Sequence, residues 1–167
     1  LEPASAGHKD GQIVIAGSSI NQDGRSSTLT APNGPSQHEV VRGALIDGSL
    51  STDEICGIEM HGTGTSLGDP IEVGALKKVF ESANSAVPLS LSSSKSWVGH
   101  AEPAAGINGL LNAISAAATQ SARPIMHLLS VNPHIGNMIS SDGIKPGRSF
   151  DLYMPRECSN MQSVDRI

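Results

Sequence analysis

Apolar residues fall in short runs that alternate with amphipathic stretches along most of the chain. Four of these runs are short and bounded by polar or glycine-containing turns, which is typical of strands. They cover residues 12–17, 55–60, 88–93 and 125–131. Helical patterns lie between them, and strands that alternate with helices predict an α/β fold with helices on the faces of a sheet.

Three helices are predicted from their start and stop signals. The first follows Ser36–Glu39, whose S-x-x-E spacing is that of a capping box, and it ends at Gly48. The second begins with Asp69 as the N-cap and Pro70 at the first helical position, where its missing N–H costs nothing. The third, over residues 102–119, is apolar or small nearly all round, which predicts a helix buried among other elements.

The end of the chain differs from the rest, because residues 132–167 lose this periodicity and are rich in Ser, Gly and Pro. We therefore expect one compact domain over residues 1–135 and an irregular tail over residues 136–167. No apolar run approaches the roughly 18 residues that a membrane-spanning helix needs. A soluble protein, cytoplasmic or organellar, is the expectation.

Charge and cysteine content narrow the classes of function. The chain has 11 Lys and Arg against 16 Asp and Glu, and it has no basic run, so binding to nucleic acid is not expected. Cys56 and Cys158 have neither CxxC nor another metal-like spacing. Cys56 lies in an apolar run and is predicted to be buried and inert. No disulfide framework and no metal site are expected.

Three polar loops that contain glycine each follow a predicted strand. They cover residues 18–35, 61–68 and 94–101. Since ligands of open α/β sheets bind beyond the ends of the strands, we expect these loops to converge. A dinucleotide-binding loop is one rival interpretation of residues 62–68, but Gly68 comes one residue too late for that fingerprint. A P-loop is excluded, because no Gly-Lys-Ser/Thr follows.

The loops contain several motifs in a fixed order. They are Asn-Gln-Asp-Gly at 21–24, Thr-Ala-Pro-Asn-Gly-Pro at 30–35, His-Gly-Thr-Gly-Thr at 61–65, Gly-Asp-Pro-Ile-Glu at 68–72 and Lys-Ser-Trp-Val-Gly-His at 95–100. Together they resemble, over about residues 14–135, the C-terminal half of the β-ketoacyl synthase (ketosynthase) domains of polyketide synthases. The resemblance implies a thiolase-like half-domain: a mixed sheet of about four to five strands, with helices on its faces and a buried central helix.

The same resemblance implies an activity, the decarboxylative Claisen condensation of acyl and malonyl thioesters in polyketide or fatty acid synthesis. His61 and His100 match the family's two active-site histidines, which would present N–H donors to the thioester oxygen as negative charge develops there. Lys95 matches the active-site lysine, and Glu102 matches the acidic residue that follows the second histidine. A cation and a carboxylate that flank a histidine can set its orientation and charge.

A substrate carrier is also implied. Thr63 and Thr65 match positions whose hydroxyls hold the phosphopantetheine arm of an acyl carrier protein, and the glycines between them would let that arm approach the backbone. An acyl carrier protein is therefore an expected partner of an active enzyme. No tightly bound cofactor is implied.

The chain departs from the family pattern at three points. It has no turn of the Ala-Cys-Ser-Ser type, which carries the nucleophilic cysteine, and no closing Gly-Thr-Asn-Ala-His stretch. Trp97 stands where the family has a small or polar residue, and it would either block a substrate channel or anchor the half-domain against another surface.

Two hypotheses follow from these departures. In the first, catalysis needs an N-terminal ketosynthase half that bears the cysteine; in the second, the chain is a catalytically inactive subunit with a structural or assembly role in a larger complex. A free-standing nucleotide-binding domain is a weaker third. Under the first two, the half alone would expose the apolar helix over residues 102–119, so the N-terminal half or another protein is expected to cover it.

Overall fold

The computed structural model describes residues 13–24, 31–83, 88–140, 152–153 and 159–160. Helices and strands alternate along these residues, as the sequence predicted. The helices are α1 (Gly34–Asp47), α2 (Gly68–Phe80), α3 (Lys95–Val98), α4 (Ala105–Thr119) and α5 (Pro133–Ser140), with 3-10 turns η1 (Thr52–Glu54) and η2 (Glu102–Ala104). The strands are β1 (Gly57–Glu59), β2 (Leu89–Ser92), β3 (Ser121–Ala122), β4 (Leu152–Tyr153) and β5 (Ser159–Asn160).

Three of the strands form a parallel sheet in the order β1-β2-β4, and β3 pairs antiparallel with β5. Parallel neighbours need a crossover connection, and α2 provides it between β1 and β2. The register places Gly57 opposite Ser90 and Glu59 opposite Ser92, so both strands end at the same edge. The predicted α/β class is confirmed.

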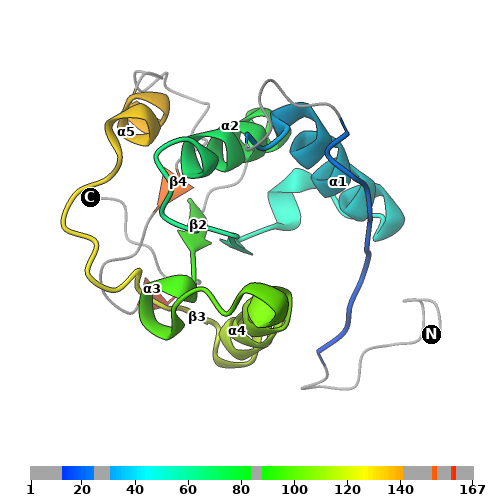
Figure 1. Ribbon diagram of the computed structural model, residues 1–167. Helices are drawn as coiled ribbons and strands as arrows, with labels where there is room; N and C mark the ends of the chain where they lie inside the picture. The colour runs from blue at the N-terminus through cyan, green and yellow to red at the C-terminus, as the bar shows by residue number, and fades with distance from the viewer. Residues whose placement is uncertain (1–12, 25–30, 84–87, 141–151, 154–158, 161–167) are drawn as a thin grey trace.

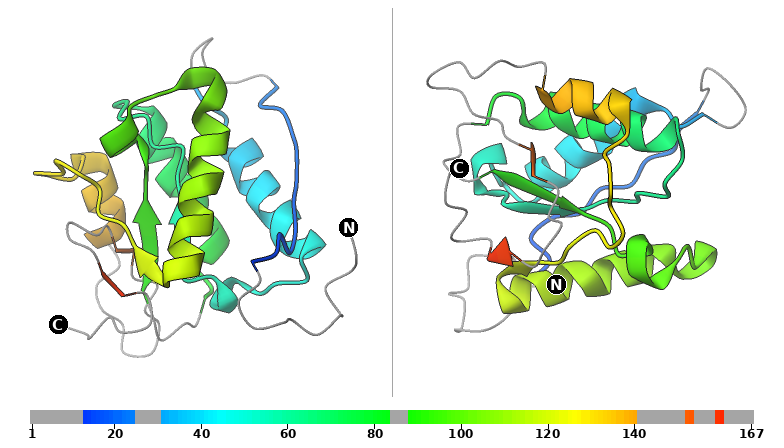
Figure 2. Two further views of the ribbon diagram at one scale, coloured as in Figure 1. Left: turned by 90° about the horizontal axis from the view of Figure 1, so that it is seen from below. Right: turned by 90° about the vertical axis from the view of Figure 1, so that its left-hand side faces the viewer.

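The sheet lies between two layers of helices. Figures 1 and 2 show α1, α2 and α5 on one side of β1 and β2, and α4 on the other. None of the helices among the described residues is long and apolar enough to cross a bilayer.

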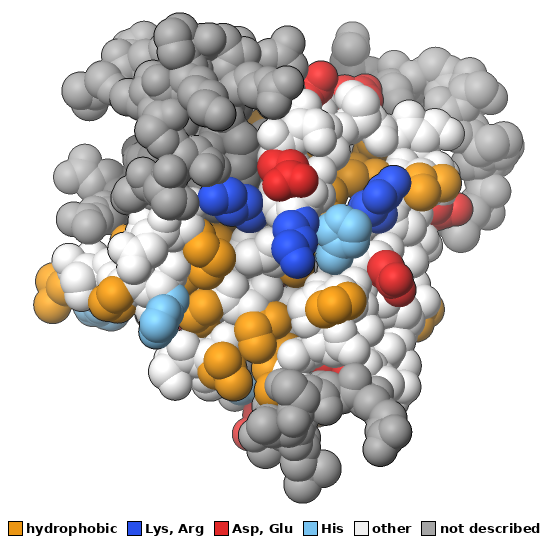
Figure 3. Space-filling model, turned by 90° about the horizontal axis from the view of Figure 1, so that it is seen from above, with side chains coloured by type: hydrophobic (Ala, Val, Ile, Leu, Met, Phe, Trp, Pro, Cys, Tyr) orange, Lys and Arg blue, Asp and Glu red, His pale blue; other side chains and the backbone are white. Residues whose placement is uncertain are grey.

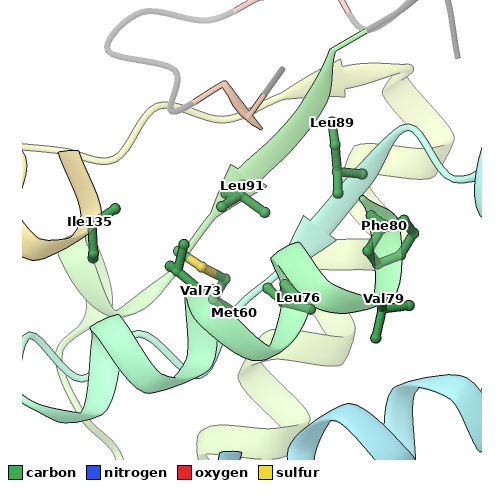
Figure 4. Close-up of a cluster of buried hydrophobic side chains, with 8 residues drawn as sticks. All are labelled: Met60, Val73, Leu76, Val79, Phe80, Leu89, Leu91 and Ile135. Carbon is green, nitrogen blue, oxygen red and sulfur yellow. The ribbon is translucent and has the colours of Figure 1, made fainter. Parts of the chain in front are cut away.

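The hydrophobic core lies between the sheet and α2. Leu91 of β2 and Val73 of α2 are fully buried. Phe80, the last residue of α2, is buried in the same cluster (Figure 4). Met60, just after β1, and Ile135 of α5 pack against the same cluster. This side of the sheet is therefore held by ordinary burial of aliphatic side chains.

The prediction of a first helix is confirmed, but its cap is not the predicted Ser36. Asn33 is the N-cap, and its Oδ1 accepts a hydrogen bond from the backbone N–H of Ser36 at 3.2 Å. Gly48 ends the helix as predicted. A Cβ at Gly17 would lie 2.4 Å from the carbonyl oxygen of Ala44, so only glycine lets the preceding segment pass this close to α1.

The predicted strands at residues 12–17 and 125–131 are wrong for their described residues, 13–17 and 125–131, which form no strand. Propensity alone does not make a strand; a neighbouring strand must accept its hydrogen bonds. The residues that follow contact α1 instead: Gly17 lies against Ala44, and the N–H of Ser18 donates to the Asp47 carboxylate at 2.8 Å. In the later segment, His127 adopts a φ of 62°, and the N–H of Leu128 donates to the carbonyl of Ile125, so the chain turns rather than extends.

Two further predictions need correction. Residues 133–140 form α5, although the sequence predicted irregular structure from residue 132 onward. The side chain of Asn132 accepts the N–H of His134 and thereby starts this helix. Cys56 is exposed rather than buried, since it precedes the short edge strand β1 and contributes its carbonyl to the N–H of Ser90. Cys158 lies outside the described residues, and the boundary at residue 135 stays a prediction.

Helix α4 is the element whose surroundings matter most for function. Figure 2 shows α4 at the front of its left view, on the side of the sheet opposite α2. The outer face of the helix is apolar and exposed. Four of its side chains are 38–61% exposed. They are Ile107, Leu110, Leu111 and Ile114. The exposure expected for an isolated half-domain is thus observed, and the described residues do not bury this face of the helix.

Candidate active site

Two loops meet where β1 and β2 end. The loop after β1 carries His61, and the turn after α3 carries His100; their ring centroids lie 5.4 Å apart and the ring planes are 85° to each other. Because parallel neighbours end at one edge of the sheet, loops far apart in sequence are brought together there. The predicted convergence of these two loops is therefore observed.

The third loop of that prediction reaches the same region only in part. Residues 25–30 lie outside the described residues. Asn33 donates its side-chain N–H to the carbonyl of Asp23 at 2.7 Å, and Asp23 accepts the backbone N–H of Asn33, so the pair shapes the loop as expected. The following Gly34 lies against Ile71 in the first turns of α2.

The His61 loop is fixed by carboxylates from α2. Glu72 accepts the backbone N–H groups of His61 at 2.6 Å and Gly62 at 2.9 Å, one on each carboxylate oxygen. Asp69 accepts the N–H of Gly64 at 3.1 Å. The predicted role of Asp69 as N-cap is wrong: the helix begins at Gly68, and Asp69 turns back to hold the loop instead.

The His61 loop also contacts the segment that follows β2. The hydroxyl of Ser93 donates to the carbonyl of Gly62 at 3.3 Å. Gly62 has a φ of 48°, and a Cβ there would lie 2.7 Å from the Ser93 hydroxyl, so the contact requires glycine. The histidine loop is thereby locked to the segment that leads to Lys95.

His100 has a defined hydrogen bond on one ring nitrogen. Its Nδ1 accepts the backbone N–H of Glu102 at 3.3 Å, which places the proton of a neutral imidazole on Nε2. Glu102 contributes this bond with its backbone, at a positive φ of 37°. The Nε2–H is then available as a donor to a ligand in front of the ring.

The pKa of His61 lies below its ordinary value. Partial burial lowers this pKa most, and the positive charge of Lys95 lowers it further, while Glu72 opposes both effects. His61 therefore stays neutral to a lower pH than a histidine with the ordinary pKa. Among the charged groups of the described residues, Lys95 of α3 lowers this pKa most.

Thr63 and Thr65 turn toward the start of α2. The Thr65 hydroxyl accepts the N–H of Gly68 at 3.0 Å, and both hydroxyl oxygens lie within about 4 Å of the space a Cβ of Gly68 would fill. Both threonines can still donate their hydroxyl protons. The six predicted site residues thus lie in the segments that follow β1 and β2, four of them on loops, Lys95 in α3 and Glu102 in η2.

Sequence reasoning missed the roles of Glu59 and Glu72. Glu72 lies inside one of the motifs, and Glu59 lies two residues before another. A carboxylate that binds backbone N–H groups leaves no periodic signal in the sequence. Glu59, the last residue of β1, accepts hydrogen bonds from the Ser94 backbone, the Asn112 side chain and the Ser92 hydroxyl.

Trp97 packs at the outer side of α3. The guanidinium carbon of Arg123 lies 5.0 Å from the centroid of its indole ring, a cation–π contact, and the ring is 40% exposed. The neighbouring Ser96 accepts the N–H of Met126 at 3.1 Å. These contacts tie α3 to the segment that follows α4.

A shallow hollow of about 450 Å³ lies elsewhere, between α1 and the C-terminal end of α2. Figure 3 shows Lys, Arg and His side chains close together on the face seen from above. The lining of the hollow includes His38, Arg42, Leu45, Lys78 and Glu81. The His61 loop meets the opposite end of α2, roughly 18 Å away along a helix of this length. The described residues contain no cluster of three or more His, Cys, Asp or Glu suited to a metal ion.

The fold and this site define a thiolase-like ketosynthase half. Residues 13–129 match the family model of the β-ketoacyl synthase C-terminal domain, and the chain belongs to this family. It is 42% identical to the spectinabilin polyketide synthase system protein NorA' of Streptomyces orinoci, over 81% of this chain and 4% of that protein. It is 46% identical to the pikromycin polyketide synthase component PikAII of Streptomyces venezuelae, over 70% of this chain and 3% of that protein.

Solved structures agree with this assignment. The ketosynthase from module 6 of the bacillaene synthase of Bacillus subtilis 168 has a TM-score of 0.74 and 32% identity, over 90% of this chain and 25% of that one. The oxazolomycin ketosynthase domain OzmH KS7 of Streptomyces albus JA3453 has a TM-score of 0.75 and 28% identity, over 88% and 24%. The chain therefore spans about a quarter of these ketosynthases and a few per cent of the curated relatives.

Proposed function

We propose that this chain supplies the histidine-bearing part of a β-ketoacyl synthase that catalyses decarboxylative Claisen condensation. The observation that carries the proposal is the pairing of His61 with His100, 5.4 Å apart, with each held by backbone contacts. The nucleophilic cysteine would come from an N-terminal ketosynthase half, and that half would cover the apolar outer face of α4.

In this reaction the acyl chain is a thioester of that cysteine, and the malonyl unit is a thioester of an acyl carrier protein. Loss of CO₂ breaks the bond between the malonyl carboxylate and its neighbouring carbon, and leaves an enolate. His61 and His100 would donate N–H bonds to the enolate oxygen. The enolate carbon then attacks the acyl carbonyl, and the cysteine thiolate leaves.

The protonation states of the histidines suit this role. A neutral imidazole donates one N–H without carrying a charge of its own, and the lowered pKa of His61 favours that form. For His100, the bond from Glu102 to Nδ1 leaves Nε2–H free to donate. Lys95 would add positive charge beside the developing oxyanion.

The phosphopantetheine arm would enter along the threonine loop. Thr63 and Thr65 lie on one side of the loop that begins at His61, and both hydroxyls can donate to amide oxygens of the arm. Gly64, with a φ of 77°, has no atom within 4 Å of the position a Cβ would take. The backbone there is open to an approaching ligand.

The test is an assay of malonyl decarboxylation and of condensation, with the full-length protein that carries both halves and a carrier protein. His61→Ala or His100→Ala is expected to lower kcat on the order of 100- to 1,000-fold, as when one oxyanion donor is lost. His38→Ala on α1 is the matched control and is expected to leave kcat unchanged. Unchanged activity in both site variants would contradict the proposal.

A second candidate function is a catalytically inactive subunit that supports a larger complex. Trp97 favours this second function, because it stands where the family has a small or polar residue. Its partly exposed indole ring lies two residues after Lys95 on α3, where it would block a substrate channel. This function predicts that the full-length protein assembles but neither decarboxylates nor condenses, and that replacing Trp97 with Asn does not restore either activity. Condensation by the unmodified protein would exclude it.

A further inference from the structure

We infer that Glu59 is a positioning residue, which sets the place of Lys95 and His100 by holding the backbone N–H of Ser94. This inference rests on the proposed function, since it assigns a further residue to the same site. Glu59 was not among the site residues that the sequence predicted.

Three hydrogen-bond donors from three segments converge on this carboxylate. One oxygen accepts the backbone N–H of Ser94 at 2.6 Å, where the chain enters α3. The other oxygen accepts the side-chain N–H of Asn112 at 2.7 Å and the hydroxyl of Ser92 at 2.9 Å. A single side chain of β1 is thus bound to the end of β2, the start of α3 and the middle of α4.

Glu59 connects the two segments of the chain that carry the site residues. Glu59 comes two residues before His61, and Ser94 comes one residue before Lys95. Helix α3 has only four residues and no side-chain cap, so its own hydrogen bonds fix its position weakly. The bond from Ser94 to Glu59 therefore determines where α3 begins, and with it the direction of Lys95.

The surroundings leave Glu59 little freedom to move. Asn112 is 6% exposed, and Ser94 is 2% exposed. Gly109 brings α4 so close that a Cβ there would lie 3.5 Å from Cγ of Glu59. A charge-assisted bond to a buried backbone N–H is stronger than a neutral one, so this carboxylate is a stiff link between the sheet and α3.

Replacing Glu59 with glutamine removes the negative charge but keeps the length of the side chain, so it separates the effect of position from that of charge. The glutamine carbonyl oxygen can still accept the backbone N–H of Ser94, since a backbone N–H can only donate. The glutamine NH₂ can donate to the Ser92 hydroxyl and to the Oδ1 of a flipped Asn112, an oxygen that has no partner now. Aspartate does the opposite, because it keeps the charge and shortens the reach by one methylene.

The experiment compares Glu59→Gln with Glu59→Asp in the full-length protein. Positioning predicts that the Gln variant keeps most of the kcat, while the Asp variant loses about 100-fold in kcat, as for a small misplacement of a catalytic group. The KM for the malonyl carrier substrate should change less than kcat. If Asp is as active as the unmodified protein and Gln is not, the charge rather than the position matters, and the inference is overturned.

A second readout does not depend on activity. Lys95 lowers the pKa of His61, so displacement of α3 in the Asp variant should raise that pKa when it is measured by NMR titration of the full-length protein. The Gln variant should leave it close to that of the unmodified protein. If the unmodified protein proves inactive, the proposed function fails, yet this titration still decides the positioning; equal pKa values in all three proteins would overturn it.

A matched control is available at the other end of the fold. Glu54 also accepts a backbone N–H, that of Ser51 at 2.7 Å, together with the Ser51 hydroxyl at 3.0 Å. It lies in η1, before β1, and contacts no predicted site residue. Glu54→Asp makes the same chemical change, and it is expected to alter neither kcat nor the pKa of His61.

Discussion

Leu89 and Leu91 point from β2 toward α2, whereas Ser90 and Ser92 point toward α4, because successive side chains of a strand alternate between its two faces. The α2 side of the sheet buries an aliphatic core. The α4 side instead carries polar side chains, with Glu59 bonded to Asn112 of the helix. Two faces of one small sheet thus differ in the forces that hold their helices.

The orientation of α4 follows from this difference. It directs Asn112 and Gly109 toward the sheet and its largest apolar side chains away from it. A surface helix of a complete domain does the reverse. We therefore expect a partner to cover the outer side of helix α4, while the polar contacts beneath it hold the helix to the sheet.

The largest expected effect is on the outer face of α4. Replacing Ile107 and Leu111 with Asp would bury two unpaired carboxylates when a partner covers the helix, at about 3–5 kcal/mol each. Association of this chain with a separately produced N-terminal half, measured by sedimentation, should be lost, together with condensation activity. The chain's own fold should persist, because both side chains are exposed in it.

Leu129→Asp is the control for this double change. Leu129 is 90% exposed and lies beyond the end of α4, so the same substitution there should leave association and activity intact. If the Asp substitutions at Ile107 and Leu111 also leave association and activity intact, no partner covers the outer face of α4. The difference between the two faces of the sheet would then have no bearing on function.

The two faces of β2 can be compared directly. Leu91→Ala should lower local stability by about 2–5 kcal/mol, because it leaves a cavity in the core. Ser90→Ala should be close to neutral, since the hydroxyl of Ser90 is buried without a hydrogen-bond partner. Hydrogen exchange of α2 amides measures both effects; equal losses would show that the two faces are packed alike.

A change at Lys95 tests the electrostatics of the site. Lys95→Met should raise the pKa of His61, because one of the charges that lowers it is removed. Activity that needs neutral His61 should then be lost at a higher pH when the solution is acidified. The acidic limb of the pH–kcat profile should therefore move to higher pH. A limb that stays in place or moves to lower pH would contradict this electrostatic assignment.

The smallest effect is expected at the cap of α1, far from α4. Asn33→Ala removes the side-chain acceptor for the N–H of Ser36 and should cost about 1 kcal/mol of local stability. Asn33→Asp keeps an acceptor and should cost less. Urea-dependent hydrogen exchange of α1 amides distinguishes the two variants, and an equal loss in both would show that the cap does not depend on this acceptor.

The sequence predicted best where local signals and packing agree. The strand predicted at residues 88–93 is observed as β2 (Leu89–Ser92), because leucines alternate with serines there and a strand pairs on each side. Residues 13–17 carry β-branched side chains but no hydrogen-bond partner among the described residues, so propensity misled the prediction. Helix α5 was missed because Pro133 and Gly136 interrupt its apolar pattern.

For the site, motif order identified which residues belong together, and geometry supplied what holds them. The resemblance pointed to His61, Lys95 and His100 without any distance. Glu59 and Glu72 bind backbone N–H groups across 35 and 11 residues respectively. Contacts of this kind depend on how the loops fold, so the periodicity of the sequence cannot predict them.

The central claim is that a cysteine-bearing half covers α4 and completes the site of His61 and His100. A crystal structure of the full-length protein tests it most directly. The account predicts a second sheet with its own central helix packed on Ile107 and Leu111, and a cysteine sulfur that faces both histidine rings. Solvent or an unrelated domain over α4, or a cysteine far from the histidines, would contradict it.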